Sequence, residues 1–289
     1  MVGKLVINQK HPYFNKKAVL TSKHHKHQII APAFSEVLGL TLKDHSADTD
    51  QLGTFSGEVE RTLSPKKTAI LKARIGMKEL GVSIGVSSEG SIGLDPQMPF
   101  AISDIELVVL VDDERQIEIF ETYRSFEIAA IRESVSPGQN LEDFLLRARF
   151  PGHKLIVSSH KSKSFDFHKG IDTIKGLQAA IQKCAELSED GLALIQSDLR
   201  AHCSPTRAQN IKLAASKLAT RVASQCSRCD TPGWGKVGHE RGLDCAQCGL
   251  IVSSALRYEV FGCVKCEHVE QGRQPSKKAD PATCSNCNP

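Results

Sequence analysis

The strongest constraint on the fold is a set of four Cys-x-x-Cys pairs near the C-terminal end of the chain. Of the 10 cysteines in the 289 residues, only Cys184 and Cys203 lie outside these pairs. The pairs are separated by 15, 14 and 17 residues, and they comprise Cys226, Cys229, Cys245, Cys248, Cys263, Cys266, Cys284 and Cys287. Two thiolates three residues apart can chelate one Zn²⁺, and two such pairs complete a tetrahedral site. The spacing therefore predicts two structural zinc ions, with no coordination position open to water or substrate.

Two other uses of paired cysteines are disfavoured. Residues 1–14 lack the apolar segment of a secretory signal, so we predict a cytoplasmic protein, in which disulfides are rare. A redox-active Cys-x-x-Cys normally occurs once, at a strand-to-helix turn, and not four times in a glycine-rich tail. The sequence does not decide which pairs share an ion. Neighbouring pairs are the simplest choice, and interleaved or nested pairings remain open.

The cysteines also indicate a domain boundary near Ser224. We predict a zinc-ribbon-like domain over residues 225–289 and an α/β domain over residues 1–224. In the α/β domain, the predicted strands cover residues 18–21, 82–86, 107–111, 115–123, 154–158 and 192–195. The predicted helices cover residues 28–38, 65–80, 140–147, 171–184 and 205–222. This alternation is typical of a mixed, largely parallel sheet flanked by helices, and no apolar run approaches the roughly 18 residues of a membrane span.

The net charge of the chain argues against a long nucleic-acid partner. Its formal value is +4 when every cysteine is neutral. Eight thiolates contribute −8 and two Zn²⁺ ions contribute +4, which brings the net charge to 0. The tail has 8 Lys plus Arg against 7 Asp plus Glu, so it shows no basic face. These values favour a small anionic ligand or nucleotide, although the tail could still bind nucleic acid or a protein, or cap the main domain.

The first candidate site lies at the junction between the strand at residues 18–21 and the following helix. Thr21, Ser22 and Lys26 occur there, and free amides at a helix N-terminus suit a phosphate. Lys72 could neutralise phosphate charge, while Glu58 and Glu89 could hold Mg²⁺. The alternative is a solvated basic loop, with both carboxylates facing water beside glycine turns.

A second candidate site precedes the helix at residues 205–222. Arg200 and Arg207 can grip a phosphate in bidentate fashion, and Asp198 could join a metal ion or hold an arginine. The alternative is an ordinary capped helix in which Asp198 pairs with Arg200. Cys203 is interpreted as a structural residue.

The chain also resembles known families in two ways. The whole chain resembles an uncharacterised bacterial family of domains of unknown function, through residues 18–34, 48–58, 88–93, 197–207 and the tail ending Cys287-Asn288-Pro289. Residues 1–125 are similar to the inosine triphosphate pyrophosphatase superfamily, in the order strand, Thr-Ser-x-x-x-Lys, helix, Gly-Thr-Phe with a following Glu, Lys-Ala-Arg, and strand followed by Glu-Gly. That superfamily releases pyrophosphate from non-standard purine nucleoside triphosphates with Mg²⁺. The resemblance implies phosphate contacts at Thr21, Ser22, Lys26 and Lys72, a metal ligand at Glu58, and a ligand or base at Glu89.

This chain departs from the superfamily at three places. Lys23 stands where Asn is usual, Ser88-Glu89 replaces an acidic pair, and the Ser-His-Arg segment that recognises the base is missing. We therefore predict a Mg²⁺-dependent nucleotide phosphohydrolase, with Glu58, Glu89 and Asp198 as its catalytic residues and a structural zinc tail. The alternative is a non-catalytic module that binds an anionic ligand and uses the zinc domain for interaction with nucleic acid or protein.

Overall fold

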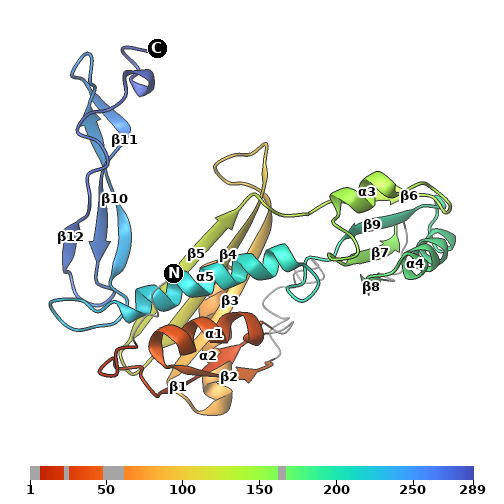
Figure 1. Ribbon diagram of the computed structural model, residues 1–289, viewed down its shortest axis with the longest axis horizontal. Coiled ribbons are helices and arrows are strands. Elements are labelled where there is room, and N and C mark those ends of the chain that lie inside the picture. Colours follow the sequence, from red (N-terminus) through yellow and green to blue (C-terminus); the bar gives the residue numbers. More distant parts are fainter. Residues whose placement is uncertain (1–6, 23–25, 48–61, 162–166) are drawn as a thin grey trace.

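The computed structural model describes residues 7–22, 26–47, 62–161 and 167–289. The chain forms a five-stranded sheet, a four-stranded sheet and a three-stranded sheet (Figure 1). The three-stranded sheet carries the paired cysteines and is called the hairpin below, after its two long strands. The hairpin and the four-stranded sheet extend to opposite sides of the five-stranded sheet, and helix α5 runs along that sheet between them (Figure 1).

The five-stranded sheet is built from the first half of the chain. Its elements are β1 (Lys17–Thr21), α1 (His27–Leu38), β2 (Thr41–His45), α2 (Pro65–Leu80), β3 (Ile84–Leu94), β4 (Ile102–Asp112) and β5 (Ile117–Ser125). The strand order is β2-β1-β3-β4-β5. β1 pairs in parallel with β2 and β3, because helices connect β1 to β2 and β2 to β3. β3, β4 and β5 pair antiparallel, since short turns join them.

Helices cover both faces of this sheet, and the alternation of side chains along the strands assigns each residue to a face. Ala18, Leu20 and Val108 pack with α1 and with α5 (Pro205–Ala223). Val19 and Val109 belong to a separate core with α2. The helices α1 and α2 therefore lie on opposite faces of the sheet.

Local sequence signals define the ends of α2. The Ser64 side chain accepts a hydrogen bond from the Lys67 amide, and Pro65 occupies the first turn, where its missing N–H costs no helical bond. Gly81 ends the helix with φ 65°, a conformation that glycine adopts without strain. The helix therefore covers residues 65–80, as predicted.

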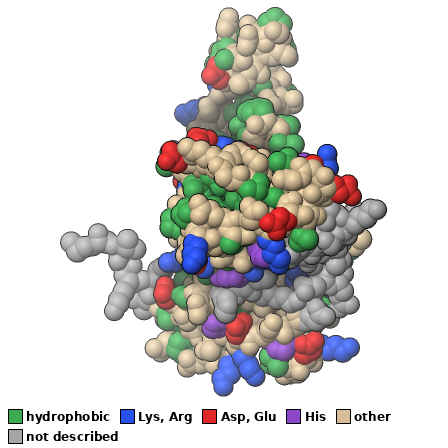
Figure 2. All heavy atoms as spheres, turned by 90° about the vertical axis from the view of Figure 1, so that its right-hand side faces the viewer, with side chains coloured by type: hydrophobic (Ala, Val, Ile, Leu, Met, Phe, Trp, Pro, Cys, Tyr) green, Lys and Arg blue, Asp and Glu red, His purple; other side chains and the backbone are tan. Residues whose placement is uncertain are grey.

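The second sheet forms a lobe of its own. It contains β6 (Arg132–Val135), α3 (Glu142–Arg147), β7 (Leu155–Ser159), β8 (Phe167–Ile171), α4 (Ile174–Glu186) and β9 (Ala193–Ser197), and its strand order is β6-β9-β7-β8. Every pairing in this sheet is antiparallel. Apolar side chains from these strands and from α3 and α4 form a separate core. Figure 2 views the molecule from this side and shows Lys, Arg and His side chains gathered below a patch of hydrophobic ones.

The hairpin follows α5. It consists of β10 (Gly235–Asp244), β11 (Ile251–Gly262) and β12 (Val269–Gln271), followed by the short 3-10 helix η2 (Pro281–Thr283). β11 pairs antiparallel with both of its neighbours.

The predicted fold class, a mixed α/β sheet flanked by helices with a cysteine-rich C-terminal part, is confirmed. Among the strands of the described residues, only β2-β1-β3 pair in parallel, so the sheet is mixed with less parallel pairing than predicted. The alternating strands and helices of the second half form an antiparallel sheet instead. Its strands lie in the order β6-β9-β7-β8, and each runs opposite to its neighbours. None of the helices in the described part of the chain has the length and apolar character needed to cross a bilayer.

Candidate functional site

The candidate site lies where β1 ends. Since β1 connects through α1 to β2 on one side and is flanked by β3 on the other, the strand order reverses at β1. Ligands of open α/β sheets bind beyond the carboxyl ends of strands at such switch points. β1 ends at Thr21, opposite Ser87, whereas β3 continues to Leu94. Ser88, Glu89 and Gly90 therefore lie beyond the end of β1.

Lys26 stands at this end of β1 as the first residue before α1. Its side chain is buried, and Nζ donates a hydrogen bond to Ser88 Oγ at 3.0 Å. Burial, and then the positive charge of Arg207, lower the pKa of Lys26 to about 8, while Glu106 and Glu89 act in the opposite direction. Lys26 therefore carries a proton at neutral pH but holds it less tightly than an exposed lysine does.

Lys72 and Glu89 meet on the face of the sheet that α2 covers. They form an ion pair in which the Glu89 side chain is 5% exposed and that of Lys72 is 17% exposed. Thr21 is buried nearby against α2, where Gly76 leaves room for its hydroxyl. A Cβ on Gly76 would overlap Thr21 Oγ1, so α2 needs glycine at this position.

Arg207 and Glu106 meet on the other face, from the first turn of α5 and from β4. Arg207 Nε donates to Glu106 Oε1 at 2.6 Å, and the side chains are 3% and 0% exposed. The pair crosses β3 at Gly90, where an added Cβ would lie 2.5 Å from both Arg207 Nη2 and Glu106 Oε1. Gly90 thus permits the close approach of this buried ion pair.

Asp104 and Asn210 continue the same polar region. Asn210 Nδ2 donates to Asp104 Oδ2 at 2.8 Å, and Asp104 is fully buried. Burial, and then the charge of Glu106, raise the pKa of Asp104 to about 7. Among the described residues, Asp104 Oδ1 and Glu106 Oε2 have no hydrogen-bond partner. Buried polar atoms without partners are uncommon in protein interiors.

These residues form the interior charge cluster: Lys26, Lys72, Glu89, Asp104, Glu106, Arg207 and Asn210. They come from α1, α2, α5, β3 and β4. Three cations face two carboxylates and the readily protonated Asp104, so charge is nearly balanced inside the cluster. This arrangement suits a ligand that carries negative charge together with a divalent cation.

The structure brings together several of the residues predicted from the sequence. Lys26, Lys72, Glu89 and Arg207 belong to the interior charge cluster, and Thr21 lies beside it. Ser22 follows β1, half-buried, with its amide bonded to the His45 carbonyl. The predicted metal ligand Glu58 lies outside the described residues, as do Lys23, His24 and His25 of the predicted basic loop.

Asp198 and Arg200 engage each other instead. Arg200 Nε donates to Asp198 Oδ1 at 2.9 Å and Nη2 donates to Oδ2 at 2.5 Å, while Asp198 also accepts the Gly170 amide. Burial acts to raise the pKa of Asp198, but the hydrogen bonds from Arg200 hold it below its usual range. Burial raises the pKa of Cys203 to about 11, so this thiol stays protonated. This geometry matches the structural alternative for the segment, with Asp198 pairing Arg200.

Asp104, Glu106 and Asn210 were missed from the sequence. Asp104 and Glu106 alternate with apolar residues in β4, and such alternation resembles an edge facing solvent. One signal was present: the next residues of the same face, Val108 and Leu110, are apolar, and apolar residues at alternate positions indicate a buried face. Two carboxylates on a buried face require partners.

The eight paired cysteines form two clusters of four. Cys226 and Cys229 meet Cys263 and Cys266, and Cys245 and Cys248 meet Cys284 and Cys287. The pairing is therefore interleaved, one of the arrangements that the sequence left open. Within each cluster, the Sγ atoms of one Cys-x-x-Cys pair lie 3.6 to 3.8 Å from those of the other pair. Four sulfurs placed tetrahedrally about 2.3 Å from a zinc ion are about 3.8 Å apart, so both clusters could bind zinc, and all ten cysteines are free of disulfides.

The β10–β11 ladder separates the two clusters. Gly235 pairs with Gly262 at the end of the hairpin near α5, and Asp244 pairs with Ile251 at the far end, where the C-terminus lies (Figure 1). Asp230 and Gly249, which each follow a Cys-x-x-Cys pair, have positive φ angles of 57° and 75°. Trp234 stacks on His268 beside the first cluster, with ring centroids 5.0 Å apart.

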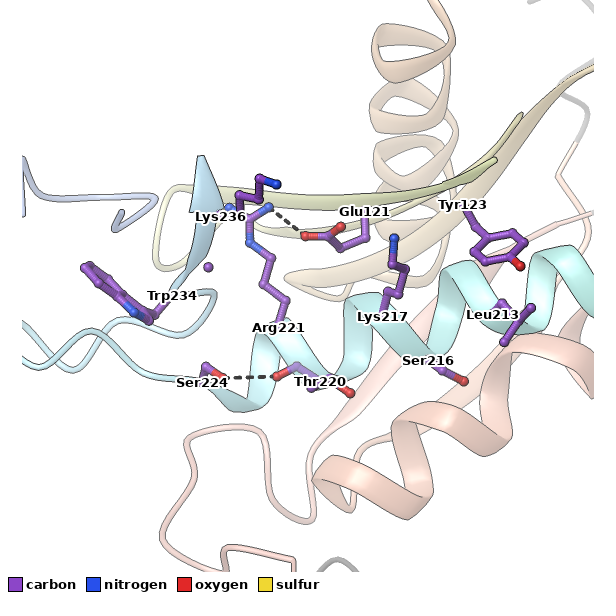
Figure 3. Close-up of a pocket in the computed structure, with 11 residues that line it drawn as sticks. Glu121, Tyr123, Leu213, Ser216, Lys217, Thr220, Arg221, Ser224, Trp234 and Lys236 are labelled. Carbon is purple, nitrogen blue, oxygen red and sulfur yellow. Dashed lines mark hydrogen bonds and ion pairs between the residues drawn. The ribbon is translucent and has the colours of Figure 1, made fainter. Parts of the chain in front are cut away.

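A surface pocket of about 530 Å³ lies at the foot of the hairpin, between α5, β5 and the start of β10 (Figure 3). Arg221 crosses this junction: it donates to Glu121 at 3.0 Å and to the Gly233 carbonyl at 3.1 Å. Lys236 pairs with Glu259, and Lys217 donates to the Thr122 carbonyl. Of these contacts, the hydrogen bond from Arg221 to Gly233 is the one that attaches the segment before β10 to the α/β body.

Comparison with known proteins identifies a family but no activity. The family described as Domain of unknown function (DUF6671) matches residues 72–289. That range includes both cysteine clusters and every residue of the interior charge cluster except Lys26. No match was found among curated proteins or among solved structures.

Proposed function

The chain belongs to the DUF6671 family of domains of unknown function, and from its interior charge cluster we propose that it is a Mg²⁺-dependent nucleotide phosphohydrolase with a structural zinc hairpin. The observation that carries the proposal is the meeting of Lys26, Lys72, Glu89 and Arg207 at the carboxyl end of β1. Four separate elements place these side chains there, and both faces of the sheet contribute.

Burial of these charges supports a functional role. Burying ionised side chains costs free energy that their mutual attraction seldom recovers fully, so a structural core is more stably built from apolar residues. A ligand phosphate entering between Lys26, Lys72 and Arg207 would gain charge-assisted hydrogen bonds in a site of low dielectric constant. The lowered pKa of Lys26 supports this as well, because a phosphate would stabilise its charged form.

Glu89 is suited to act as a magnesium ligand. Mg²⁺ is usually held by one or two carboxylates together with water and substrate phosphates, so a single buried carboxylate beside a phosphate site is sufficient protein ligation. In the described residues, the clusters of three or more metal-binding groups are formed by cysteines alone, and therefore the ion would arrive with the nucleotide. When bound there, Mg²⁺ would polarise a phosphoryl oxygen.

Hydrolysis of a nucleoside triphosphate is the reaction class we propose, with the inosine triphosphate pyrophosphatase resemblance as the source of that choice. The residues that carry it and are described, Thr21, Ser22, Lys26, Lys72 and Glu89, all lie at the end of β1 or beside it. We propose a small anionic ligand in preference to a long nucleic acid, because the cationic groups are inside the fold and not spread over a surface.

Each cysteine cluster is proposed to hold one structural Zn²⁺, since four thiolates leave no open position. The test is metal analysis of the purified protein and of two variants. Wild type and Cys184→Ala, a buried cysteine outside both clusters, should contain two zinc ions per chain, and Cys226→Ser should contain about one. Wild type without zinc, or two ions retained in Cys226→Ser, would contradict the assignment.

The proposed reaction is tested with zinc-loaded protein, Mg²⁺ and a panel of nucleotides, by measuring phosphate and pyrophosphate release. Wild type should hydrolyse at least one nucleotide, and Glu89→Gln should lower kcat at least about 100-fold while Asp113→Asn, an exposed carboxylate, leaves it unchanged. The proposal is wrong if wild type releases neither phosphate nor pyrophosphate, or if Glu89→Gln releases as much as wild type. Ligand-dependent stabilisation without release would instead favour the non-catalytic binding module.

A further inference from the structure

Asp104 and Glu106 form a distinct part of the interior charge cluster. They are two residues apart on β4, so their side chains emerge on the same face of the sheet. Both are fully buried. Each uses one oxygen for a protein partner: Asp104 Oδ2 accepts from Asn210, and Glu106 Oε1 accepts from Arg207. Asp104 Oδ1 and Glu106 Oε2 remain without a partner in the described part of the chain.

A single proton accounts for both unpartnered oxygens. Two neighbouring carboxylates in a buried position do not both stay ionised, because each charge disfavours the other. If one of the two carboxyl groups is protonated, its O–H can donate a hydrogen bond to the other. Asp104 Oδ1 and Glu106 Oε2 then become donor and acceptor. Such a pair titrates as a unit.

Positive charge near the pair comes from two helices. The titratable and hydrogen-bonding groups around it are Arg207 and Asn210 from α5, Lys26 from the start of α1, and Tyr123, which lies opposite Glu106 on β5. β3 places only Ser88, Gly90 and Ile92 next to this face. Within the described part of the chain, Arg207 is the cation bonded directly to the pair, and its guanidinium sets how much negative charge the pair can hold.

We propose that Asp104 and Glu106 share one proton, position Arg207 for an anionic ligand, and take up a proton from solution when the ligand's phosphate draws the guanidinium away from Glu106. This inference rests on the proposed function for its ligand, though not for the pair itself. When the guanidinium of Arg207 lies farther away and a phosphate is nearby, the negative charge of the pair is less well stabilised. Its proton occupancy consequently rises, and ligand binding is coupled to protonation.

The coupling is measured by isothermal titration calorimetry of the full chain with inorganic pyrophosphate, near pH 7, in buffers of different ionisation enthalpy. The dependence of the heat on the buffer gives the number of protons taken up. Because the pKa of Asp104 is about 7, the pair in wild type should take up roughly half a proton per pyrophosphate, in addition to any protons that the ligand itself gains or loses on binding. Lys26, with a pKa of about 8, is already mostly protonated at this pH and contributes little.

Asp104→Asn should bind pyrophosphate with a proton uptake lower than that of wild type by roughly half a proton, and Glu106→Gln should do the same. Asp112→Asn is the matched control, since Asp112 is equally buried on the same strand but far along it, and its uptake should equal that of wild type. Binding with the same proton uptake in wild type, Asp104→Asn and Glu106→Gln overturns the inference and leaves the proposed function intact.

Absence of pyrophosphate binding would overturn the proposed function and the coupling, and a ligand-free measurement then decides on the proton pair. Wild-type stability should fall relative to Asp104→Asn as pH rises from about 4 to 7, because the folded state retains a proton that the unfolded state releases. A stability difference that does not change over this range shows that no such proton is held.

Discussion

The two ends of β4 carry equally buried carboxylates in opposite circumstances. At the carboxyl end, Asp112 accepts hydrogen bonds from the Tyr13 hydroxyl at 2.8 Å, from the Arg115 amide at 2.9 Å and from the Arg115 guanidinium at 3.0 Å. At the other end, Asp104 and Glu106 each keep one oxygen without a partner among the described residues.

The difference separates a structural polar group from a functional one. Burial and the charge of Asp112 raise the pKa of Tyr13, which therefore remains a hydrogen-bond donor at all physiological pH values. The Asp112 network is complete without a ligand and joins the start of the chain to β4. Hydrogen bonding around Asp104 is incomplete, and a site with unsatisfied polar groups has lower stability but higher affinity for a ligand that satisfies them.

The largest effect is expected from Arg207→Met. This variant leaves Glu106 as a buried carboxylate without its cation, and the free energy of unfolding should fall by about 3–5 kcal/mol. Adding Glu106→Gln should recover most of the loss, because the double variant contains no buried charge at either position. Equilibrium urea unfolding of the single and double variants measures this coupling. A double variant as unstable as Arg207→Met contradicts a charge-based explanation.

A smaller effect is expected at the satisfied end of the strand. Asp112→Asn removes the ionised acceptor of Tyr13 and Arg115, and should lower the free energy of unfolding by about 1–3 kcal/mol. Pyrophosphate affinity should not change, because the partners of Asp112 lie outside the interior charge cluster. The same urea experiment, combined with calorimetry, gives both quantities. If Asp112→Asn also lost affinity for pyrophosphate, the two ends of β4 would not differ in ligand binding, which would contradict this comparison.

Asp104→Asn should change stability in the opposite direction above neutral pH. Since the folded-state pKa of Asp104 is raised from 3.8 to about 7, its contribution to stability is complete below about pH 4 and is lost as pH rises through 7. At pH 8 the variant should therefore be more stable than wild type, and at pH 4 the two should be nearly equal. Thermal unfolding across this pH range decides the sign, and a variant less stable than wild type at pH 8 would be inconsistent with a buried charge.

Much of the site was predictable because it lies at the junction of a strand and a helix. Lys26 follows a buried strand and precedes a helix start, and Lys72 recurs on a helix with clear ends, so simple patterns placed both. Glu89 follows a buried strand in the same way. The meeting of these residues depends on β1 lying between β2 and β3, which the local patterns did not predict.

The remainder depended on long-range pairing. Asp104 and Glu106 have an alternation pattern that does not reveal which neighbours cover their face, and Arg207 is brought to them only because α5 returns to the first sheet after the four-stranded lobe. The interleaved cysteine clusters were undetermined for a similar reason. The Gly-rich segments between the cysteine pairs gave no sign of the long β10–β11 ladder that carries the second pair away from the first.

The most direct test of the proposed site is whether the unsatisfied end of β4 binds a phosphate ligand. The measurement is the thermal unfolding midpoint of zinc-loaded protein with and without pyrophosphate and Mg²⁺, for wild type, Lys26→Met and Asp112→Asn. We predict that the ligand raises the midpoint of wild type and of Asp112→Asn by similar amounts, because binding to the folded state alone stabilises it. Lys26→Met should lose most of this shift. No shift in wild type, or an equal shift in Lys26→Met, would contradict the assignment of the interior charge cluster as the site.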